Sequence, residues 1–346
     1  MKTRDPQGLD HILMVLRAVA EPSRLRLLAL CGAADLTVSE MVDIIGQSQP
    51  GVSRHLKVLC DAGLLERHRE GAWIFHRLVV HGAGALLVRQ ALALTAADDP
   101  VLAGDAQRLA AVRRVRAEAA EAYFRTNAGR WAEVRSLHID EADVEMAILT
   151  LLGDRRYQAL LDIGTGTGRI LELLAPMAAV AEGVDSSREM LALARSRIEA
   201  AGIGHCSVRL GDMYRLGDAG RRFDLVTIHQ VLHFALDPAA VIAEAARVLA
   251  PGGRLAVVDF APHGLESLRE EHNHRRLGFA DGEVSGWCRA AGLTIGTIRH
   301  LPGRPLTVTL WLAESVADVA SRPAVPELPA PELPAPELTA TAGGVA

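Results

Sequence analysis

The chain has 346 residues, 49% of them hydrophobic, and a formal net charge of -5 at pH 7, which predicts at least two globular domains and argues against non-specific coating of nucleic acids. Residues 1–95 carry 11 Lys/Arg and 9 Asp/Glu, so any contact with DNA is expected there. Four scattered cysteines, a first segment unlike a signal peptide and no apolar run of about 18 residues predict a cytoplasmic protein with reduced thiols and no membrane partner.

The first elements of the chain predict a helix-turn-helix. Pro22 opens a helix, since a proline fits the first helical turn. Thr37 and Glu40 have the spacing of a capping box at the start of the next helix, which Gly46 can end in a left-handed conformation. Ser48 can cap the helix that follows. Two helices joined by a short turn containing glycine are typical of a helix-turn-helix.

The polar side of the helix that begins after Ser48 suits the major groove of DNA. Gln and Arg can make paired hydrogen bonds to base edges, while Ser and Lys reach phosphates; a solvated polar surface is the alternative. Residues 64–78 alternate in character around Glu70 and Gly71, which predicts a hairpin wing whose arginines, Arg77 among them, can reach the DNA backbone or minor groove. The predicted DNA-binding residues are Gln49, Ser53, Arg54, His55, Lys57, Arg67 and Arg69.

Three motifs in residues 8–95 are typical of one repressor family. They are Pro22-Ser-Arg-Leu-Arg-Leu-Leu28, Val52-Ser-Arg-His-Leu-Lys-Val-Leu59 and Asp61-Ala-Gly-Leu-Leu65. With them the chain resembles the ArsR/SmtB winged-helix repressors. The resemblance implies a homodimer on a palindromic double-stranded DNA operator, paired through the first helix and the helix containing Leu86, Leu87 and Leu92. Where many members carry a Cys-x-Cys metal site, this chain has Val38-Ser39-Glu40, so no metal site is predicted.

The next segment, residues 98–152, is rich in Ala, Arg and Glu. Residues 108–123 and 140–151 are expected to be helical, with Pro100 and Gly129 as breaks. We interpret the segment as a helical spacer that also covers the second domain.

A glycine-rich loop follows a buried strand predicted at residues 159–163. Gly164, Gly166 and Gly168 let the backbone turn sharply and approach a ligand with no side chain between. Their GxGxG spacing differs from the GxGxxG of dinucleotide sites, which requires a glycine at Arg169. The loop therefore predicts a nucleoside cofactor and argues against a dinucleotide.

Acidic residues follow the next two predicted strands. A strand over 180–184 ends at Asp185, at the separation where a carboxylate binds ribose hydroxyls. A strand over 207–210 leads to Asp212, which can accept a hydrogen bond from an adenine amine, and to Met213, which can pack on its ring. Further strands at 223–228 and 254–260, a helix at 239–249 and a late hairpin at 293–299 and 306–312 predict a doubly wound, mostly parallel sheet.

Asp162, the three glycines, Asp185, Asp212 and Arg247-Val-Leu-Ala-Pro-Gly-Gly253 occur in an order specific for one family. Over roughly residues 155–313 the chain resembles class I S-adenosylmethionine-dependent methyltransferases. This implies an α/β, Rossmann-like domain with a mostly parallel seven-stranded sheet that binds S-adenosylmethionine (SAM) or S-adenosylhomocysteine (SAH). The resemblance assigns the methionine end to Asp162 and the glycine loop, the ribose to Asp185 and the adenine to Asp212 with Met213. The full predicted cofactor set is Asp162, Gly164, Gly166, Gly168, Asp185, Ser186, Asp212, Met213, His229 and Gln230.

Histidines near the predicted cofactor site are candidates for catalysis. His229, His233 and Asp259 would flank the transferred methyl group and can act as acid or base, so His229 and His233 are the candidate catalytic residues. His263, His272 and His274 can form a metal or substrate site, although the charged run around the last two is more simply a solvated helix surface.

Two functions remain open from the sequence. In the first, a repressor senses SAM or SAH with its methyltransferase-like domain and couples this to operator binding. In the second, a working methyltransferase acts on a small molecule and carries a winged-helix regulatory domain. We favour the first, because the sequence shows no clear group of substrate-binding residues.

The predicted organisation has four segments. A winged helix-turn-helix (α+β) and dimerisation domain covers residues 1–95, a helical linker 96–152, the methyltransferase-like domain 153–315, and a Pro-rich disordered tail 316–346.

Overall fold

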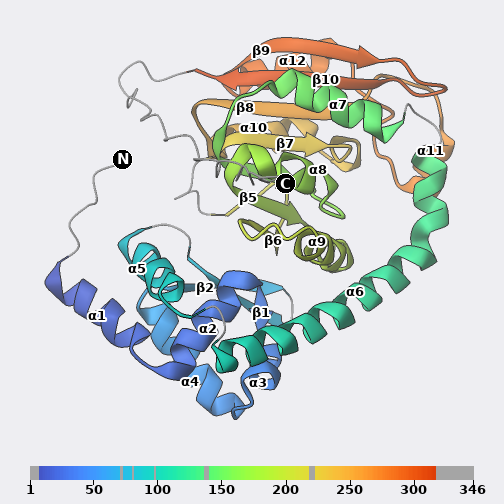
Figure 1. Ribbon diagram of the computed structural model, residues 1–346. Coiled ribbons are helices and arrows are strands. Elements are labelled where there is room, and N and C mark those ends of the chain that lie inside the picture. Colours follow the sequence, from blue (N-terminus) through green and yellow to red (C-terminus); the bar gives the residue numbers. More distant parts are fainter. Residues whose placement is uncertain are drawn as a thin grey trace, which may run out of the picture.

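The computed structural model describes residues 8–70, 73–79, 82–96, 99–135, 140–217 and 223–316. Two modules are visible, and one long helix runs along both of them (Figure 1). The predicted wing turn at Gly71 and the predicted tail from residue 317 onward lie outside the described residues. Within the described part of the chain, no helix is both long and apolar enough to cross a bilayer.

The N-terminal module is a helix-turn-helix followed by a wing. Its elements are α1 (Leu9–Val19), α2 (Pro22–Ala33), β1 (Leu36–Thr37), α3 (Val38–Ile45), α4 (Gln49–Asp61), β2 (Leu65–Glu70), β3 (Trp73–Leu78) and α5 (Gly82–Ala93). The three strands form an antiparallel sheet in the order β1-β3-β2. The predicted hairpin is therefore confirmed over the described residues of its two strands.

Local signals set the helix boundaries of this module. The capping box is confirmed, since Thr37 N–H donates to the Glu40 carboxylate at 2.8 Å and the Thr37 hydroxyl accepts from Glu40 N–H at 3.4 Å. Gly46 ends α3 with φ of 73°. Ser48 occupies the N-cap position of α4, but its side chain makes no capping hydrogen bond, so that part of the prediction is wrong.

Helix α6 (Pro100–Arg135) is longer and less interrupted than predicted, because it continues through Gly129. Pro100 begins the helix rather than breaking it, as its missing N–H donor is not needed in the first turn. Leu109 of α6 is buried in the N-terminal core, whereas Val144 of α7 (Glu141–Leu152) is buried under the C-terminal sheet. The predicted spacer is thus shared between the two cores.

The C-terminal module is a seven-stranded sheet in the order β6-β5-β4-β7-β8-β10-β9. All pairs are parallel except those that β10 makes with β8 and β9. This confirms the predicted α/β fold and its late antiparallel hairpin. The strands are β4 (Tyr157–Ile163), β5 (Ala178–Asp185), β6 (Cys206–Leu210), β7 (Phe223–His229), β8 (Leu249–Phe260), β9 (Leu293–Leu301) and β10 (Val308–Ser315).

Helices cover both faces of this sheet. On one face, Leu160 packs with α7, α8 (Arg169–Leu174) and α9 (Arg188–Ala200). On the other, Leu161 packs with α10 (Pro238–Val248) and α12 (Asp281–Ala290). The short helices η1 (Ala175–Met177), η2 (Leu232–Phe234) and α11 (Ser267–His272) complete the module. The strand order reverses between β4 and β7, and in such sheets the carboxyl ends at the reversal form a binding crevice.

Candidate functional site

The glycine loop turns directly after β4 and is anchored to β5. The N–H groups of Gly164 and Thr165 both donate to the Val184 carbonyl, at 2.7 and 3.0 Å. Gly164 and Gly168 have φ of 70° and 75°, a region where side chains are strained. A Cβ on Gly168 would lie 3.0 Å from that of Ala194, so the third predicted glycine serves close packing against α9.

Asp185 at the end of β5 fixes the loop as well as facing the cavity. Its two carboxylate oxygens accept from Gly166 N–H and Ser187 N–H, each at 2.8 Å. The remaining lone pairs of the carboxylate are available to a ligand. Ser187 also caps α9 by accepting from Met190 N–H at 3.2 Å.

Asp162, the one acidic residue of β4, precedes the loop and is buried. Burial raises the pKa of Asp162 to about 6, and the nearby charge of Asp185 also raises it. Hydrogen bonds from the hydroxyls of Thr227 and Thr165 partly offset this by lowering the pKa. The Thr227 hydroxyl donates to Asp162 at 2.6 Å. Thr227 was not predicted, because only the register of β4 and β7 brings it beside Asp162.

The predicted cofactor residues surround one cavity of about 920 Å³. Gly168 is the exception, because it packs against Ala194 of α9 and does not line the cavity. Gln230 adopts φ of 51°, unusual for a residue with a side chain, and its buried Nε2 has no hydrogen-bond partner within the described residues. Backbone strain of this kind is concentrated at binding sites. The residues on the cavity wall are Asp162, Gly164, Gly166, Asp185, Ser186, Asp212, Met213, His229 and Gln230.

Several histidines line the same cavity. The His233 Nδ1–H donates to Asp259 at 2.8 Å, and both side chains are buried. His272 and His274 also line the cavity. The prediction of a solvated helix surface is wrong for His274, which follows α11 and is buried against His233 with 4.0 Å between ring centroids.

The exposed face of α4 carries most of the predicted DNA-binding residues. Gln49, Ser53, Arg54 and Lys57 are exposed on it, and Arg67 and Arg69 are exposed on β2. Lys57 pairs with Asp61 at 2.8 Å. His55 is half-buried and lies 3.5 Å from the carboxylate of Glu21, so it points away from this exposed group.

Arg77 was predicted to reach DNA from the wing, and this is wrong. Arg77 lies opposite Glu66 in the hairpin, so its side chain is on the other face of the wing from Arg67 and Arg69. It is almost fully buried. Its guanidinium donates to the hydroxyl of Ser207 on β6. This face of the wing is therefore packed against the C-terminal module.

Helix α9 joins the two modules. At one end, the Arg197 guanidinium donates to Thr167 of the glycine loop at 3.1 Å. On the other side, Arg195 lies 4.2 Å above the ring of Phe75 in the wing, and Glu199 accepts from Arg116 of α6 at 2.9 Å. One helix therefore contacts both the cofactor loop and the DNA-binding module.

Comparisons with known proteins find a helix-turn-helix domain in the N-terminal module and a methyltransferase domain in the C-terminal module. A family described as "Methyltransferase domain" matches residues 161–257, and one described as "Helix-turn-helix domain" matches residues 19–68. The ubiquinone biosynthesis O-methyltransferase of Azotobacter vinelandii is 32% identical over 164 residues, covering 43% of this chain and 69% of that protein. The protein of the same name from Pseudomonas aeruginosa is 29% identical over 216 residues, covering 56% and 91%.

Among solved structures, the N-methyltransferase NodS of Bradyrhizobium japonicum, in complex with SAH, is similar with a TM-score of 0.43. The two are 21% identical, and the match covers 51% of this chain and 87% of NodS.

Proposed function

Because the chain belongs to the methyltransferase family through residues 161–257 and carries a helix-turn-helix domain over residues 19–68, we propose that it is a DNA-binding transcriptional regulator of the ArsR type. Its methyltransferase domain binds SAM or SAH and couples this to operator binding. The observation that carries the proposal is α9, which contacts the glycine loop through Arg197 and the DNA-binding module through Arg195 and Glu199.

The cavity fits this cofactor. Its backbone cradle at Gly164 and Gly166 leaves no side chain between loop and ligand. Asp185 keeps carboxylate lone pairs for a ribose, and the unpartnered Nε2 of Gln230 is a buried donor that requires an acceptor. When bound, SAM supplies a methyl group on a sulfonium and a cationic ammonium at its methionine end.

Cofactor affinity should depend on pH through Asp162. The carboxylate must be ionised to attract the ammonium of the methionine end, and its pKa before binding is about 6. SAM affinity should therefore fall as the pH drops through 6, by about tenfold at one pH unit below it. Calorimetric titrations between pH 5 and 8 measure this. Asp162→Asn should bind more weakly at all pH values and remove the slope; an equal Kd for the native chain at pH 5 and 7.5 would contradict the assignment.

Helix α6 connects the interface at α9 to the helix-turn-helix. Arg116 of α6 bonds Glu199 of α9 on one side and Glu40, the capping-box residue of α3, on the other, at 2.9 and 2.8 Å. Burial raises the pKa of Glu199 despite the opposing charges of Arg116 and Arg113. A shift of α9 on cofactor binding would therefore be transmitted to the helix that precedes the recognition helix.

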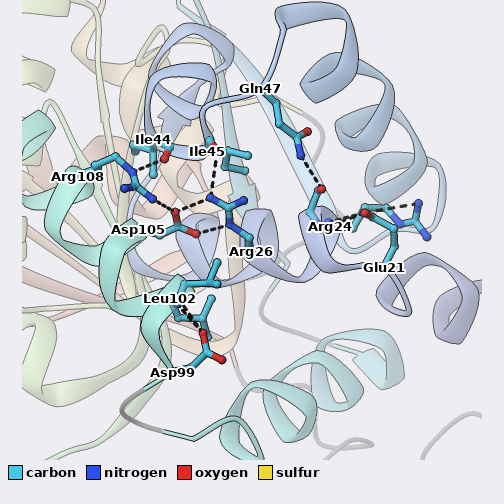
Figure 2. A network of polar contacts seen from close by, with 12 residues as sticks. Glu21, Arg24, Arg26, Ile44, Ile45, Gln47, Asp99, Leu102, Asp105 and Arg108 are labelled. Carbon is cyan, nitrogen blue, oxygen red and sulfur yellow. Dashed lines mark hydrogen bonds and ion pairs between the residues drawn. The ribbon is translucent and has the colours of Figure 1, made fainter.

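A second contact holds α6 against α2 and α3 (Figure 2). Asp105 accepts two hydrogen bonds from Arg26 of α2, at 2.6 and 2.7 Å, and one from Arg108 at 2.6 Å. Arg108 also donates to the carbonyl of Ile44 in α3. Movement of α6 would consequently move α3 with it.

Coupling is tested by measuring operator affinity with each cofactor. Duplexes selected from a random-sequence pool serve as the DNA, and fluorescence anisotropy gives Kd without ligand, with SAM and with SAH. We expect at least one ligand to change Kd by about fivefold or more, the lower end of usual coupling. Linkage requires DNA to change the affinity for that ligand by the same factor. No dependence on either ligand would overturn the regulatory proposal.

Arg116→Met is the variant that should uncouple the modules. It removes the bridge between Glu199 and Glu40 and should bring the ligand-dependent change in Kd close to one, with cofactor affinity nearly unchanged. Arg114→Met is the matched control, an exposed arginine on the same helix. A full ligand response in Arg116→Met would exclude this route.

Arg54→Ala should weaken operator binding without changing cofactor affinity. Arg54 is exposed at the centre of the α4 face, where a bidentate base contact contributes about 1–3 kcal/mol. The anisotropy assay should show a Kd increase of about tenfold or more for the selected duplex. Unchanged DNA binding would remove α4 from the proposed interface.

We also propose that the chain forms a homodimer through α1 and α5. Supporting this, α1 exposes Leu9, Leu13, Met14 and Leu16, a large apolar surface for a helix at the end of a module. Leu13→Glu should convert the sedimenting species from dimer to monomer while thermal unfolding stays similar. A native chain that sediments as a monomer at micromolar concentration would contradict the proposal.

Methyl transfer to a small molecule is the second candidate function. The buried His233–Asp259 pair on the cavity wall favours it, because an imidazole oriented by a carboxylate is a suitable general base. Counting methyl transfer from radiolabelled SAM to small-molecule extracts tests this function separately from DNA binding.

A further inference from the structure

Four aromatic rings form the cavity wall next to the proposed methyl-donor site. His233, Phe234, Phe260 and His274 all line the cavity. His233 is in contact with Phe234 and His274, with ring centroids 4.1 and 4.0 Å apart. Phe260 lies nearly parallel to His274 at 6.1 Å. The four residues, here called the ring wall, come from η2, β8 and the segment after α11, so the fold assembles them from distant parts of the sequence.

Asp259 orients the ring of His233 and favours one of its tautomers. This carboxylate is fully buried and accepts three N–H groups: the ring Nδ1–H and backbone N–H of His233, at 2.8 and 3.1 Å, and the backbone N–H of Phe260 at 2.8 Å. With its proton held on Nδ1, the imidazole keeps a free electron pair on Nε2. His233 can therefore accept a proton from a molecule in the cavity.

His274 contributes a second polar atom to the ring wall. Its side chain is 4% exposed, and its Nδ1 has no hydrogen-bond partner in the described part of the chain. Burial, together with His233, lowers its pKa to about 3, so the ring is neutral near pH 7. Buried polar atoms normally have partners. A ligand atom in the cavity would supply the missing one.

The chemistry of the ring wall selects its ligand. His233, Phe260 and His274 are buried and Phe234 is 41% exposed, and none of the four residues carries a carboxylate, ammonium or guanidinium group. An uncharged molecule is therefore favoured next to the ring wall. Aromatic surfaces pack best against planar molecules. A base on the wall is useful only if the reacting group carries a removable proton.

We propose that the ring wall binds an uncharged planar molecule with a ring hydroxyl, whose proton passes to His233 while a second polar atom bonds to His274. This inference rests on the second candidate function, methyl transfer. The hydroxyl oxygen forms a bond to the methyl carbon as the bond from that carbon to the sulfonium sulfur breaks. The electron pair of the broken bond goes to sulfur, giving neutral SAH, and the proton goes to Nε2 of His233. His233 is then the catalytic base, and His274 orients the hydroxyl compound.

The test uses 4-nitrophenol with the full-length protein loaded with SAH. Below neutral pH the probe is uncharged, and its absorbance reports both binding and transfer of its proton. We expect saturable binding of 4-nitrophenol and much weaker binding of 4-nitroanisole, which lacks the hydroxyl proton. His274→Phe keeps a ring but removes the polar atom, and should weaken 4-nitrophenol binding about fivefold. His274→Gln, which restores an amide, should recover part of this loss.

His233→Asn separates binding from catalysis. Asparagine keeps an N–H for Asp259 but has no atom at the Nε2 position. We expect 4-nitrophenol affinity to fall about fivefold, because the acceptor of its hydroxyl proton is lost. At saturating probe, methylation with SAM should slow 10²- to 10⁴-fold. His300→Gln is the matched control, since this exposed histidine lies on β9 and does not line the cavity.

The outcomes distinguish the inference from the proposed function. Absence of saturable 4-nitrophenol binding, or equal affinity in the native chain and His274→Phe, would overturn the inference while SAH binding stays intact. Unchanged methylation in His233→Asn would overturn the role of the base. Failure of the native chain to bind SAH would overturn the proposed cofactor function as well.

Discussion

Gly164→Ala is expected to abolish most cofactor binding and to destabilise the C-terminal module. Gly164 has φ of 70°, and a Cβ there would lie 2.6 Å from Cγ1 of Val231, a side chain packed against the core. Left-handed strain and overpacking together cost about 3 kcal/mol. The loop of the variant must adopt its native shape to bind SAM, so this cost raises the Kd for SAM roughly 100-fold.

Calorimetry and denaturant unfolding measure the two effects of Gly164→Ala. The matched control is Gly202→Ala, in the turn after α9. Gly202 has φ of 69°, but a Cβ there would meet nothing within 4 Å, so only strain of about 1 kcal/mol applies. Near-native SAM affinity in Gly164→Ala would show that the loop does not shape the cofactor site.

Asp105→Ala is expected to lower the free energy of unfolding of the N-terminal module by about 3 kcal/mol or more, because the largely buried guanidinium of Arg26 loses its carboxylate and keeps only the carbonyl of Ile45 as a partner. Asp105 is 2% exposed and accepts from Arg26 and Arg108 (Figure 2). Burial alone would raise its pKa, but these hydrogen bonds and charges hold the pKa below its usual 3.8. The stabilisation is therefore complete above pH 3.8 and is lost as the pH falls through the lower native value.

Urea unfolding of Asp105→Ala at pH 7 and pH 3 checks both statements. The loss of stability should be large at pH 7 and should shrink under acid conditions. Asp99→Ala is a matched control on the same helix, since it removes only the cap that accepts from Val101 and Leu102 N–H, at about 1 kcal/mol. Equal losses in the two variants would show that the buried pair contributes nothing beyond local helix stability.

The features that the sequence predicted well are those set by short-range geometry. Thr37 with Glu40 and the glycine loop are read from spacing alone, because capping and positive φ involve only a few neighbouring residues. Asp185 and Asp212 follow because the carboxyl ends of parallel strands meet at one edge. The part of the cavity wall that these loops form could therefore be named from the sequence, and the role of its residues in binding the cofactor stays a prediction.

The features that were missed depend on long-range packing. His274 follows a short helix. Its position against His233 is set by contacts such as the hydrogen bonds from the Arg275 and Arg276 N–H groups to the His233 carbonyl, which no periodicity reveals. Arg77 was placed on the wrong face because its parity relative to Arg67 depends on the register of the hairpin. The continuous α6 escaped prediction because its stability comes partly from both modules.

Because α6 contacts both modules, it limits where the chain can be cut to join one module to another protein. A fragment cut near residue 95 would lose Leu109 from its core and Asp105 from beside Arg26. A hybrid that joins the helix-turn-helix module to a foreign domain should therefore retain α6 through Arg116, and the foreign domain needs a carboxylate in the place of Glu199 to accept its hydrogen bond. Exchange of residues 1–95 alone should give an unstable protein. Exchange at the far end of α6 should give a stable one, in which the proposed coupling between cofactor and DNA binding is lost.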